Sequence, residues 1–255
     1  MLKAIFFDVD GTLAETEEFH RRAFNSAFAQ AQMNVHWSVP EYRELLKVTG
    51  GKERLRAYFL ARGLAVSERD LQALHRSKNE LYAQNLRSGS CGLRPGVLRL
   101  MTEARDCGVL LGIATTTSLV NVDALLREAL GARWKQEFAC VVAGDQVAKK
   151  KPAPDVYQCC LANLRIAPAQ AVALEDSPAG VAAARDAGVA VLATPSVYTM
   201  GEDFSRADRL VPSLGDPTMP WEQPQPGFAQ RWVALSDLQR LLAAGEIVPG
   251  TEMAQ

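Results

Sequence analysis

Two aspartates separated by one residue, Asp8 and Asp10, come directly after an apolar run at the start of the chain. The run is too short for a helix and is typical of a buried central strand, and Gly11 allows the chain to turn sharply where the strand ends. Because side chains alternate along a strand, the two carboxylates are expected to leave the sheet edge on roughly the same side. Buried like charges are costly, so the pair indicates a bound cation or a reaction that uses both groups.

Three later apolar runs also end in side chains that could do chemistry. Thr115 and Thr116 follow the first of these runs, Lys151 comes after the second, and Glu175 and Asp176 follow the third. Carboxylates at two strand ends suit a divalent cation such as Mg²⁺, which often keeps water and substrate phosphate among its ligands. A hydroxyl and a lysine suit phosphoryl oxygens. The set therefore indicates the transfer of a phosphoryl group.

Each of these residues also has a purely structural explanation. A threonine at a strand end often caps a helix, a lysine run is often a solvated surface, and Glu175–Asp176 could cap a helix that begins near Ala179. Their joint occurrence after successive strands is harder to explain in this way, because ligand sites of parallel sheets form beyond the carboxyl ends of the strands. A functional site is therefore the favoured interpretation.

The elements that position these residues alternate along the second half of the chain. Helical patterns cover 96–106, 120–130, 155–164 and 179–187, and strand patterns cover 109–114, 138–143, 171–174 and 189–193. This alternation predicts an α/β fold with a doubly wound parallel sheet and helices on both faces. The first strand must pair in the same sheet, since alone it cannot bury both of its faces.

The segment between the first strand and this alternation contains only helical patterns. They lie at 15–32, 41–48, 52–62 and 67–86. We therefore expect a discontinuous core domain, residues 1–15 and 88–255, into which an all-helical cap domain, residues 16–87, is inserted. After residue 195 the chain is less regular: 212–227 has the composition of a surface loop, and 235–244 predicts a last helix.

Composition narrows the class of function. Lys and Arg total 28 against 29 Asp and Glu, which argues against a general binder of nucleic acid or anionic membranes. The start of the chain has no pattern of a cleaved leader, and no apolar segment approaches the roughly 20 residues that span a bilayer, so a cytoplasmic protein is expected. The five cysteines lack metal-binding spacing and are expected to be reduced thiols.

Four segments together resemble the signature of the haloacid dehalogenase superfamily of phosphohydrolases. In chain order they are Asp8–Thr12, Thr115, Lys151–Asp155 and Leu174–Ser177. The resemblance covers residues 1–212 and implies that family's Rossmann-like core, with the helical insertion as its small cap. It also implies that Thr115 and Lys151 hold phosphoryl oxygens. Lys151 takes this role because it directly precedes Pro152, which leaves Lys149 and Lys150 as predicted surface charges.

The resemblance implies a role for each acidic residue. Asp8 would attack phosphorus to form an aspartyl-phosphate, which divides hydrolysis into two easier steps. Asp10 would protonate the leaving oxygen and then deprotonate the attacking water. The Mg²⁺ ligands would be the carboxylates of Asp8 and Asp176 and the backbone carbonyl of Asp10. Glu175 would support this group from outside, although direct metal contact remains open.

The helical insertion carries a cluster of polar residues that indicates the substrate. Gly50 and Gly51 precede a helix that starts near Lys52, which would free backbone amides for an anion. A nucleotide P-loop is rejected, because the upstream glycine and the following Ser or Thr of that motif are absent. A solvated helix face is an equally good interpretation of Arg54, and His20 could simply be a packed helix residue.

Within the superfamily, the cap segments resemble CbbY-type proteins. The matching segments are Thr16–His20, Thr49–Arg54, His75–Lys78 and Ala114–Ser118. CbbY-type proteins are phosphatases of sugar bisphosphates, characteristically of xylulose 1,5-bisphosphate, an inhibitor of Rubisco in the Calvin cycle. The resemblance implies a Mg²⁺-dependent enzyme that removes the 1-phosphate of this sugar.

The same resemblance assigns the substrate contacts. The substrate-binding residues that it implies are Glu17, His20, Gly50, Gly51, Lys52, Arg54, His75, Lys78 and Thr116. The cap bases among them would hold the distal phosphate, whereas Glu17 and His20 would meet the sugar hydroxyls. Two separated cationic sites would favour a bisphosphate over a monophosphate.

Three other functions stay open at the level of the sequence. A β-phosphoglucomutase-like mutase shares the signatures but returns the phosphoryl group to a sugar, and a phosphoglycolate phosphatase would need fewer cap bases. A Rubisco-binding regulator would be expected to lack a catalytic carboxylate, yet Asp8, Asp10 and Asp176 are all present. We expect a monomer whose partner is a small phosphorylated sugar, without nucleic acid, membrane or an obligatory protein partner.

Overall fold

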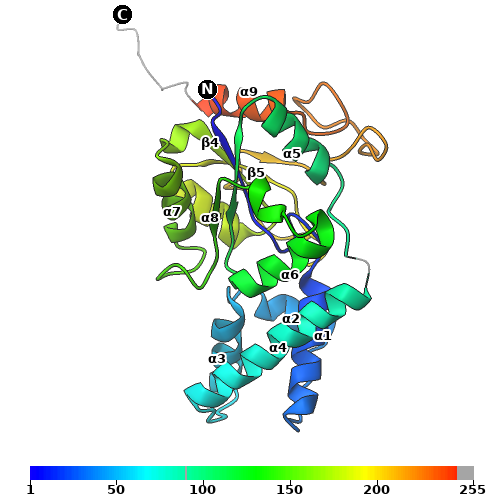
Figure 1. Ribbon diagram of the computed structural model, residues 1–255, viewed down its shortest axis with the longest axis vertical. Helices are drawn as coiled ribbons and strands as arrows, with labels where there is room; N and C mark the ends of the chain where they lie inside the picture. The colour runs from blue at the N-terminus through cyan, green and yellow to red at the C-terminus, as the bar shows by residue number, and fades with distance from the viewer. Residues whose placement is uncertain (90, 246–255) are drawn as a thin grey trace, which may run out of the picture.

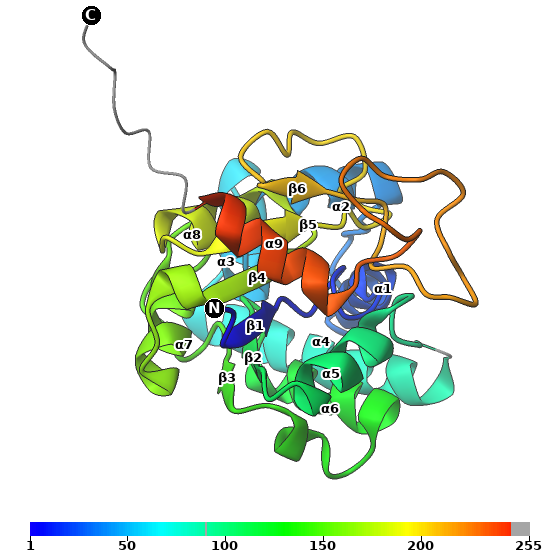
Figure 2. The same cartoon turned by 90° about the horizontal axis from the view of Figure 1, so that it is seen from above.

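The computed structural model describes residues 1–89 and 91–245, and its centre is a parallel sheet of six strands. The strands are β1 (Ala4–Phe7), β2 (Leu110–Ala114), β3 (Cys140–Val142), β4 (Ala171–Glu175), β5 (Ala190–Ala193) and β6 (Arg209–Leu210). Their order is β3-β2-β1-β4-β5-β6, with every neighbouring pair parallel (Figure 2). The order reverses beside β1, and such a reversal opens a crevice at the carboxyl ends of the strands.

Both faces of the sheet are covered by helices, which confirms the predicted doubly wound fold. The helices of the core are α5 (Val97–Asp106), α6 (Leu119–Leu130), α7 (Asp155–Leu164), α8 (Pro178–Asp186) and α9 (Leu235–Gly245). Ile5 and Phe7 of β1 pack in the buried cluster that contains α5, α6 and α9, whereas Ala4 and Phe6 pack in the one that contains α7 and α8. This alternation explains why β1 is apolar at every position, since both of its faces are buried.

Four helices between β1 and β2 form a separate block beyond the carboxyl edge of the sheet (Figure 1). They are α1 (Glu17–Gln30), α2 (Val39–Leu45), α3 (Gly51–Ala61) and α4 (Glu68–Ser88), and we call them the helical block. The block has its own aromatic core, in which Trp37 contacts Phe24 and Phe28 at ring-centroid distances of 4.7 and 4.9 Å. The four predicted helices are therefore confirmed as elements, within a few residues at each end.

Helix capping sets two of these boundaries. The hydroxyl of Ser38 accepts from the backbone N–H of Glu41 at 3.3 Å, so α2 begins at Val39, two residues before the predicted start. The hydroxyl of Ser67 accepts from Asp70 N at 3.1 Å, which confirms the predicted cap of α4. None of the described helices is long and apolar enough to cross a membrane.

The chain after residue 195 differs from expectation in two ways. Strand β6 was not predicted, because it has only two residues, both exposed, and pairs only with β5. The segment 212–227 is only partly a surface loop: Leu214 and Trp221 are buried in the cluster that contains α5 and α9. Trp221 Nε1 also donates to the backbone oxygen of Ser213 at 2.9 Å, a hydrogen bond within the segment. All five cysteines are free, as expected.

Candidate active site

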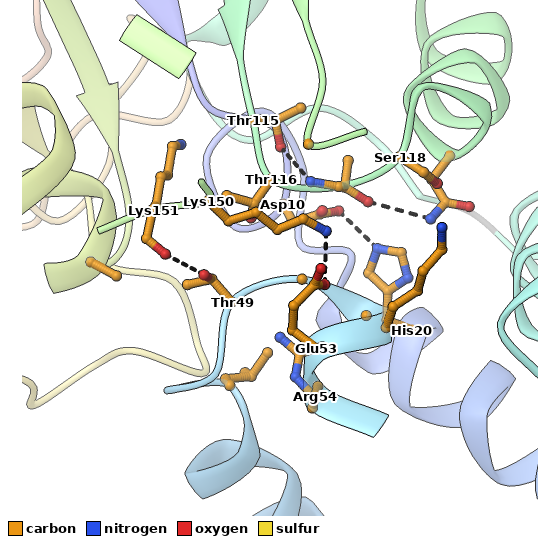
Figure 3. A pocket seen from close by; sticks show the side chains of 18 of the residues that line it. Asp10, His20, Thr49, Glu53, Arg54, Thr115, Thr116, Ser118, Lys150 and Lys151 are labelled. Atoms are coloured by element: carbon orange, nitrogen blue, oxygen red, sulfur yellow. Dashed lines mark hydrogen bonds and ion pairs between the residues drawn. The ribbon is translucent and has the colours of Figure 1, made fainter. Parts of the chain in front are cut away.

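A cavity of about 840 Å³ lies between the carboxyl edge of the sheet and the helical block, and both contribute its walls (Figure 3). From the sheet side come Asp8, Asp10, Thr115, Thr116, Lys151 and Asp176, and from the block side come Glu17, His20, Gly50, Gly51, Lys52, Arg54, His75 and Lys78. The structure thus brings every site residue predicted from the sequence to one cavity.

Lys151 is the electrostatic centre of the sheet side. Its ammonium group donates to Asp8 Oδ1 at 2.7 Å, to Glu175 Oε1 at 2.6 Å and to the backbone oxygen of Ala114 at 2.8 Å. These three contacts use all three protons of the group. Burial lowers the pKa of Lys151, but the two carboxylates outweigh burial and raise it above the ordinary value. Lys151 is therefore held as a fixed cation beside Asp8.

Three buried carboxylates, those of Asp8, Glu175 and Asp176, each offer an oxygen within 4.8 Å of the others. Burial raises the pKa of all three, that of Glu175 to about 7. Repulsion by Asp8 adds to the effect on Glu175 and Asp176, and repulsion by Asp10 adds to the effect on Asp8. One lysine does not balance three carboxylates, and the donors are all oxygen, so the group fits a hard divalent cation.

Glu175 lies at the back of this acidic group. Its Oε1 accepts from Lys151 and from the hydroxyl of Tyr157, whereas Oε2 is buried with no hydrogen-bond partner. A Cβ at Gly180 would lie 1.8 Å from Oε2, so only a glycine there leaves room for the carboxylate. The alternative that Glu175–Asp176 caps a helix is wrong, because Ser177 caps α8 by accepting from Gly180 N at 3.1 Å.

Asp10 makes a different set of contacts from Asp8. Its Oδ1 accepts from the hydroxyl of Thr16 at 2.5 Å and lies 3.0 Å from His20 Nε2. Lys78 Nζ lies 2.7 Å from His20 Nδ1. The ionised carboxylate of Asp10 can only accept, so His20 Nε2 carries the proton and the unprotonated Nδ1 accepts from Lys78. Burial opposes ionisation of Asp10, but His20 and Thr16 outweigh it and lower the pKa to about 2.

His20 and Lys78 lie deeper than the sequence indicated. Both ring nitrogens of His20 are engaged, and its ring stacks on Tyr82 at a centroid distance of 4.0 Å. Burial and the charge of Lys78 lower the pKa of His20 to about 4, so the ring is neutral near pH 7. The geometry places His20 against Asp10, and its contact with a sugar hydroxyl stays a prediction.

The hydroxyl of Tyr42 connects Arg54 and Glu17 by hydrogen bonds. The Tyr42 hydroxyl donates to Glu17 Oε2 at 2.9 Å and accepts from Arg54 Nη1 at 3.2 Å. Arg54 also donates to the backbone oxygen of Leu45 at 3.1 Å and is buried, so the alternative of a solvated helix face is wrong for this residue. Burial raises the pKa of Glu17 to about 7.

The double glycine brings His75 to the start of α3. Gly50 has φ 90°, a left-handed conformation that favours glycine, and α3 begins at Gly51. A Cβ at Gly51 would lie 2.8 Å from His75 Nε2, so the imidazole packs directly on the backbone there. Lys52 is exposed and lies at the cavity wall. Backbone amides and two bases thus line this part of the cavity.

Several contacts across the cavity were missed by the sequence reasoning. Lys150, predicted to be a surface charge, instead pairs with Glu53 of α3 at 2.8 Å, and its side chain is only 20% exposed. The hydroxyl of Thr49 donates to the backbone oxygen of Lys151. On another side, Asn121 Nδ2 of α6 donates to Asn79 Oδ1 of α4 at 3.1 Å. The two residues of each pair are far apart in the chain, so no periodicity of the sequence indicates that they are in contact.

Comparisons with known proteins agree with this geometry. A family profile described as haloacid dehalogenase-like hydrolase matches residues 2–188. Protein CbbY of Rhodobacter capsulatus is 49% identical over 213 residues, which cover 84% of this chain and 94% of that protein. Protein CbbY, plasmid, of Cupriavidus necator is 45% identical over 244 residues, 93% of this chain and 96% of that protein.

A solved structure extends the comparison to a ligand. The crystal structure of a CbbY mutant from Rhodobacter sphaeroides in complex with xylulose-(1,5)bisphosphate is 47% identical in sequence, with a TM-score of 0.80. The match covers 84% of this chain and 95% of that one. That relative binds a sugar carrying two phosphates, and its fold is that of the present chain.

Proposed function

Because the chain belongs to the haloacid dehalogenase-like hydrolase family, we propose that this phosphatase removes the 1-phosphate of xylulose 1,5-bisphosphate with the help of Mg²⁺. The observation that carries the proposal is the distribution of charge around the cavity. The acidic group and Lys151 stand on the sheet side, and a second set of bases, Lys52, Arg54, His75 and Lys78, lines the block side. A substrate with two phosphates suits a cavity in which Lys151 and a cation bound by the acidic group would hold one phosphate and the charged groups of the block side the other.

The sheet side supplies the nucleophile. Asp8 would attack phosphorus, and Lys151, 2.7 Å from Asp8 Oδ1, would exchange one of its three present acceptors for a phosphoryl oxygen as negative charge moves onto that oxygen. Thr115, buried directly after β2, would hold a second oxygen. Asp8, Asp176 and the backbone carbonyl of Asp10 would hold Mg²⁺, which when bound neutralises charge on the phosphate and on the carboxylates.

Asp10 would serve as the acid and base. Thr16 and His20 hold its carboxylate in one orientation through contacts of 2.5 and 3.0 Å. The lowered pKa keeps Asp10 ionised in the free site, which is the form that takes a proton from water. Protonation of the leaving oxygen needs the acid form, which the negative charge of an incoming phosphate would favour.

The helical block, residues 16–87, would act as a cap that selects the substrate. We infer that Lys52 and His75, together with the amides at the start of α3, bind the distal phosphate. Glu17 and Arg54, which are both hydrogen-bonded to the hydroxyl of Tyr42, would contact the hydroxyls of the sugar. The block must move away from the sheet for a charged substrate to enter, and its return would exclude water.

The test is a phosphate-release panel of sugar mono- and bisphosphates with Mg²⁺. Xylulose 1,5-bisphosphate is expected to give the highest kcat/KM, and Asp8→Asn to lower kcat by at least about a thousandfold, because the nucleophile is lost. Asp106→Asn, which changes an exposed carboxylate at the end of α5, is the matched control and should retain full activity. Retention of full turnover by Asp8→Asn would exclude Asp8 as the nucleophile.

The same panel separates the mutase alternative. With β-glucose 1-phosphate, a phosphatase yields inorganic phosphate, whereas a β-phosphoglucomutase-like enzyme yields glucose 6-phosphate. Preferred turnover of phosphoglycolate would instead indicate that the bases of the helical block do not bind a second phosphate.

A further inference from the structure

Tyr198 follows strand β5 of the sheet, yet its side chain lies in the hydrophobic core of the helical block. The buried cluster that contains it is otherwise formed by residues of the block, among them Phe24, Trp37 and Tyr42. Tyr198 is 5% exposed. It is the only buried member of this cluster, among the described residues, that the sheet side of the chain contributes.

The contacts of Tyr198 within the block are specific. Its hydroxyl donates to Glu18 Oε2 of α1 at 2.6 Å, and its ring meets Tyr42 of α2 edge-on, with centroids 5.8 Å apart and an interplanar angle of 88°. The guanidinium of Arg43 lies 5.9 Å from the ring centroid and donates to the backbone oxygen of Val197 at 3.1 Å. The turn of the core at residues 197–200 therefore contacts two helices of the block, α1 and α2.

The other side of that turn is bound to the acidic group. The hydroxyl of Thr199 donates to the backbone oxygen of Asp176 at 2.5 Å. The same hydroxyl oxygen accepts from Ser196 N at 2.9 Å, and Met200 N donates to Ser196 O at 2.9 Å. Ser196 and Thr199 are both buried, so the turn is a compact unit attached to Asp176.

Tyr42 connects this turn to the cavity. The hydroxyl of Tyr42 is bonded to both Glu17 and Arg54, and its ring packs against Tyr198. A shift of the Tyr198 ring would therefore move Tyr42, and with it the two groups that face the substrate. Displacements of about 1 Å in positioning groups can cost up to about a hundredfold in rate.

We propose that Tyr198 is a positioning residue, which holds Tyr42, and through it Glu17 and Arg54, in place relative to Asp176 when the block is closed on the sheet. The inference rests on the proposed function, in which Glu17 and Arg54 contact the sugar. This role differs from simple filling of the block's core. Tyr198 connects the hydrogen-bonded group of Tyr42, Glu17 and Arg54 to the turn that is bonded to Asp176.

Tyr58 of α3 offers a matched control. It belongs to the same buried cluster and is also 5% exposed, but its ring partners are Trp37 and Phe59 rather than Tyr42. Tyr198→Leu is expected to raise KM for the bisphosphate about tenfold. Hydrolysis of p-nitrophenyl phosphate, a small ester that does not reach the block's network, should change less than about twofold.

Tyr58→Leu should lower thermal stability by a similar amount and leave both activities nearly unchanged. Tyr198→Phe, which keeps the ring, should stay close to wild type in KM. An equal rise of KM in Tyr198→Leu and Tyr58→Leu would overturn the proposal, since it would show a structural role only. If Tyr198→Leu does not fold, Tyr198→Met, with a flexible side chain, is judged by the same criteria.

Amide hydrogen exchange of the substrate-free protein separates this inference from the proposed function. Tyr198→Leu should speed exchange at 41–46, the segment around Tyr42, more than Tyr58→Leu does, whatever the substrate is. Equal exchange in the two variants would refute the positioning role. Failure of the wild type to hydrolyse any sugar bisphosphate would refute the proposed function, and the exchange result would still decide the role of Tyr198.

Discussion

The amine of Lys78 occupies an unusual position for a lysine. It lies 4.9 Å from the ring centroid of Phe24 and 5.3 Å from that of Tyr82, and its nearest polar partner is the neutral ring of His20, at 2.7 Å. Burial lowers its pKa to about 7, against the partly compensating charges of Asp10 and Glu17. A lysine of this kind is poised to gain its full charge when an anion arrives.

This pKa predicts how stability depends on pH. Between pH 7 and about 10.5 the unfolded chain binds more protons at Lys78 than the folded protein does. The free energy of unfolding of the metal-free wild type should therefore rise with pH in this window, by up to about 1.4 kcal/mol per pH unit relative to Lys78→Met. Urea unfolding at several pH values measures the difference. A difference that does not change with pH would contradict the prediction.

Exposed Lys149 provides the control for this measurement. The difference between wild type and Lys149→Met should stay constant over the same pH range. The comparison separates the loss of the buried amine from the loss of a lysine charge at the surface.

At the scale of elements, the start of α3 shows how a turn can build an anion site. Gly50 adopts φ 90°, and Gly51 allows His75 of α4 to pack directly on the first turn of α3. The aligned peptide dipoles leave partial positive charge at this end of the helix. Exposed Lys52 adds a positive charge at the rim of this site. Two successive helices, α3 and α4, thus form one surface.

Gly51→Ala tests this arrangement. The new Cβ would lie 2.8 Å from His75 Nε2, so the imidazole must move away from the start of α3. We expect KM for a sugar bisphosphate to rise about five- to tenfold while turnover of a small monophosphate is retained, because only the distal phosphate is affected. Steady-state kinetics on both substrates measure this.

Gly63→Ala is a suitable comparison, because no atom lies within 4 Å of a Cβ there, although its positive φ predicts some loss of stability. It should leave both KM values unchanged. An equal loss of activity on the two substrates in Gly51→Ala would argue against a distal-phosphate site at α3.

At the scale of the whole molecule, the near-neutral net charge of −1 hides a strong local imbalance. Asp8, Glu175 and Asp176 are grouped inside the protein at the edge of the sheet, where burial raises the pKa of each. The fold supports this group through β1, β4 and the buried helices on both faces. Part of the stability of the metal-free protein is therefore given up to keep a cation site in place.

Removal of Mg²⁺ should accordingly lower the melting temperature. At a Mg²⁺ concentration of 100 times its Kd, the free energy of unfolding should rise by about 2.7 kcal/mol over the protein in EDTA. Asp176→Asn should lose most of this increase, and in EDTA it should melt above wild type because one of three like charges is removed. Thermal unfolding by circular dichroism measures both effects. A Mg²⁺ shift of equal size in wild type and Asp176→Asn would contradict the assigned ligand.

Much of the fold was predictable because its elements have strong local patterns. The apolar run before Asp8 and the helical pattern of 155–164 required only local burial and periodicity to be recognised. Strand β6 was missed because two exposed residues leave no pattern. The buried Trp221 was missed because a loop composition does not show which of its residues a neighbouring helix will cover.

The sequence by itself determined which chemical groups this protein has and which of them belong to the sheet edge. Carboxyl ends of parallel strands meet at one edge, so Asp8, Thr115, Lys151 and Asp176 had to come together once their strands were recognised. The tertiary structure alone decided how these groups are paired and what faces them. That His20 bonds Asp10, that Lys150 reaches Glu53, and that Tyr198 packs on Tyr42 depend on the packing of the helical block against the sheet. Such contacts join residues without a common period, so the packed chain is needed to reveal them.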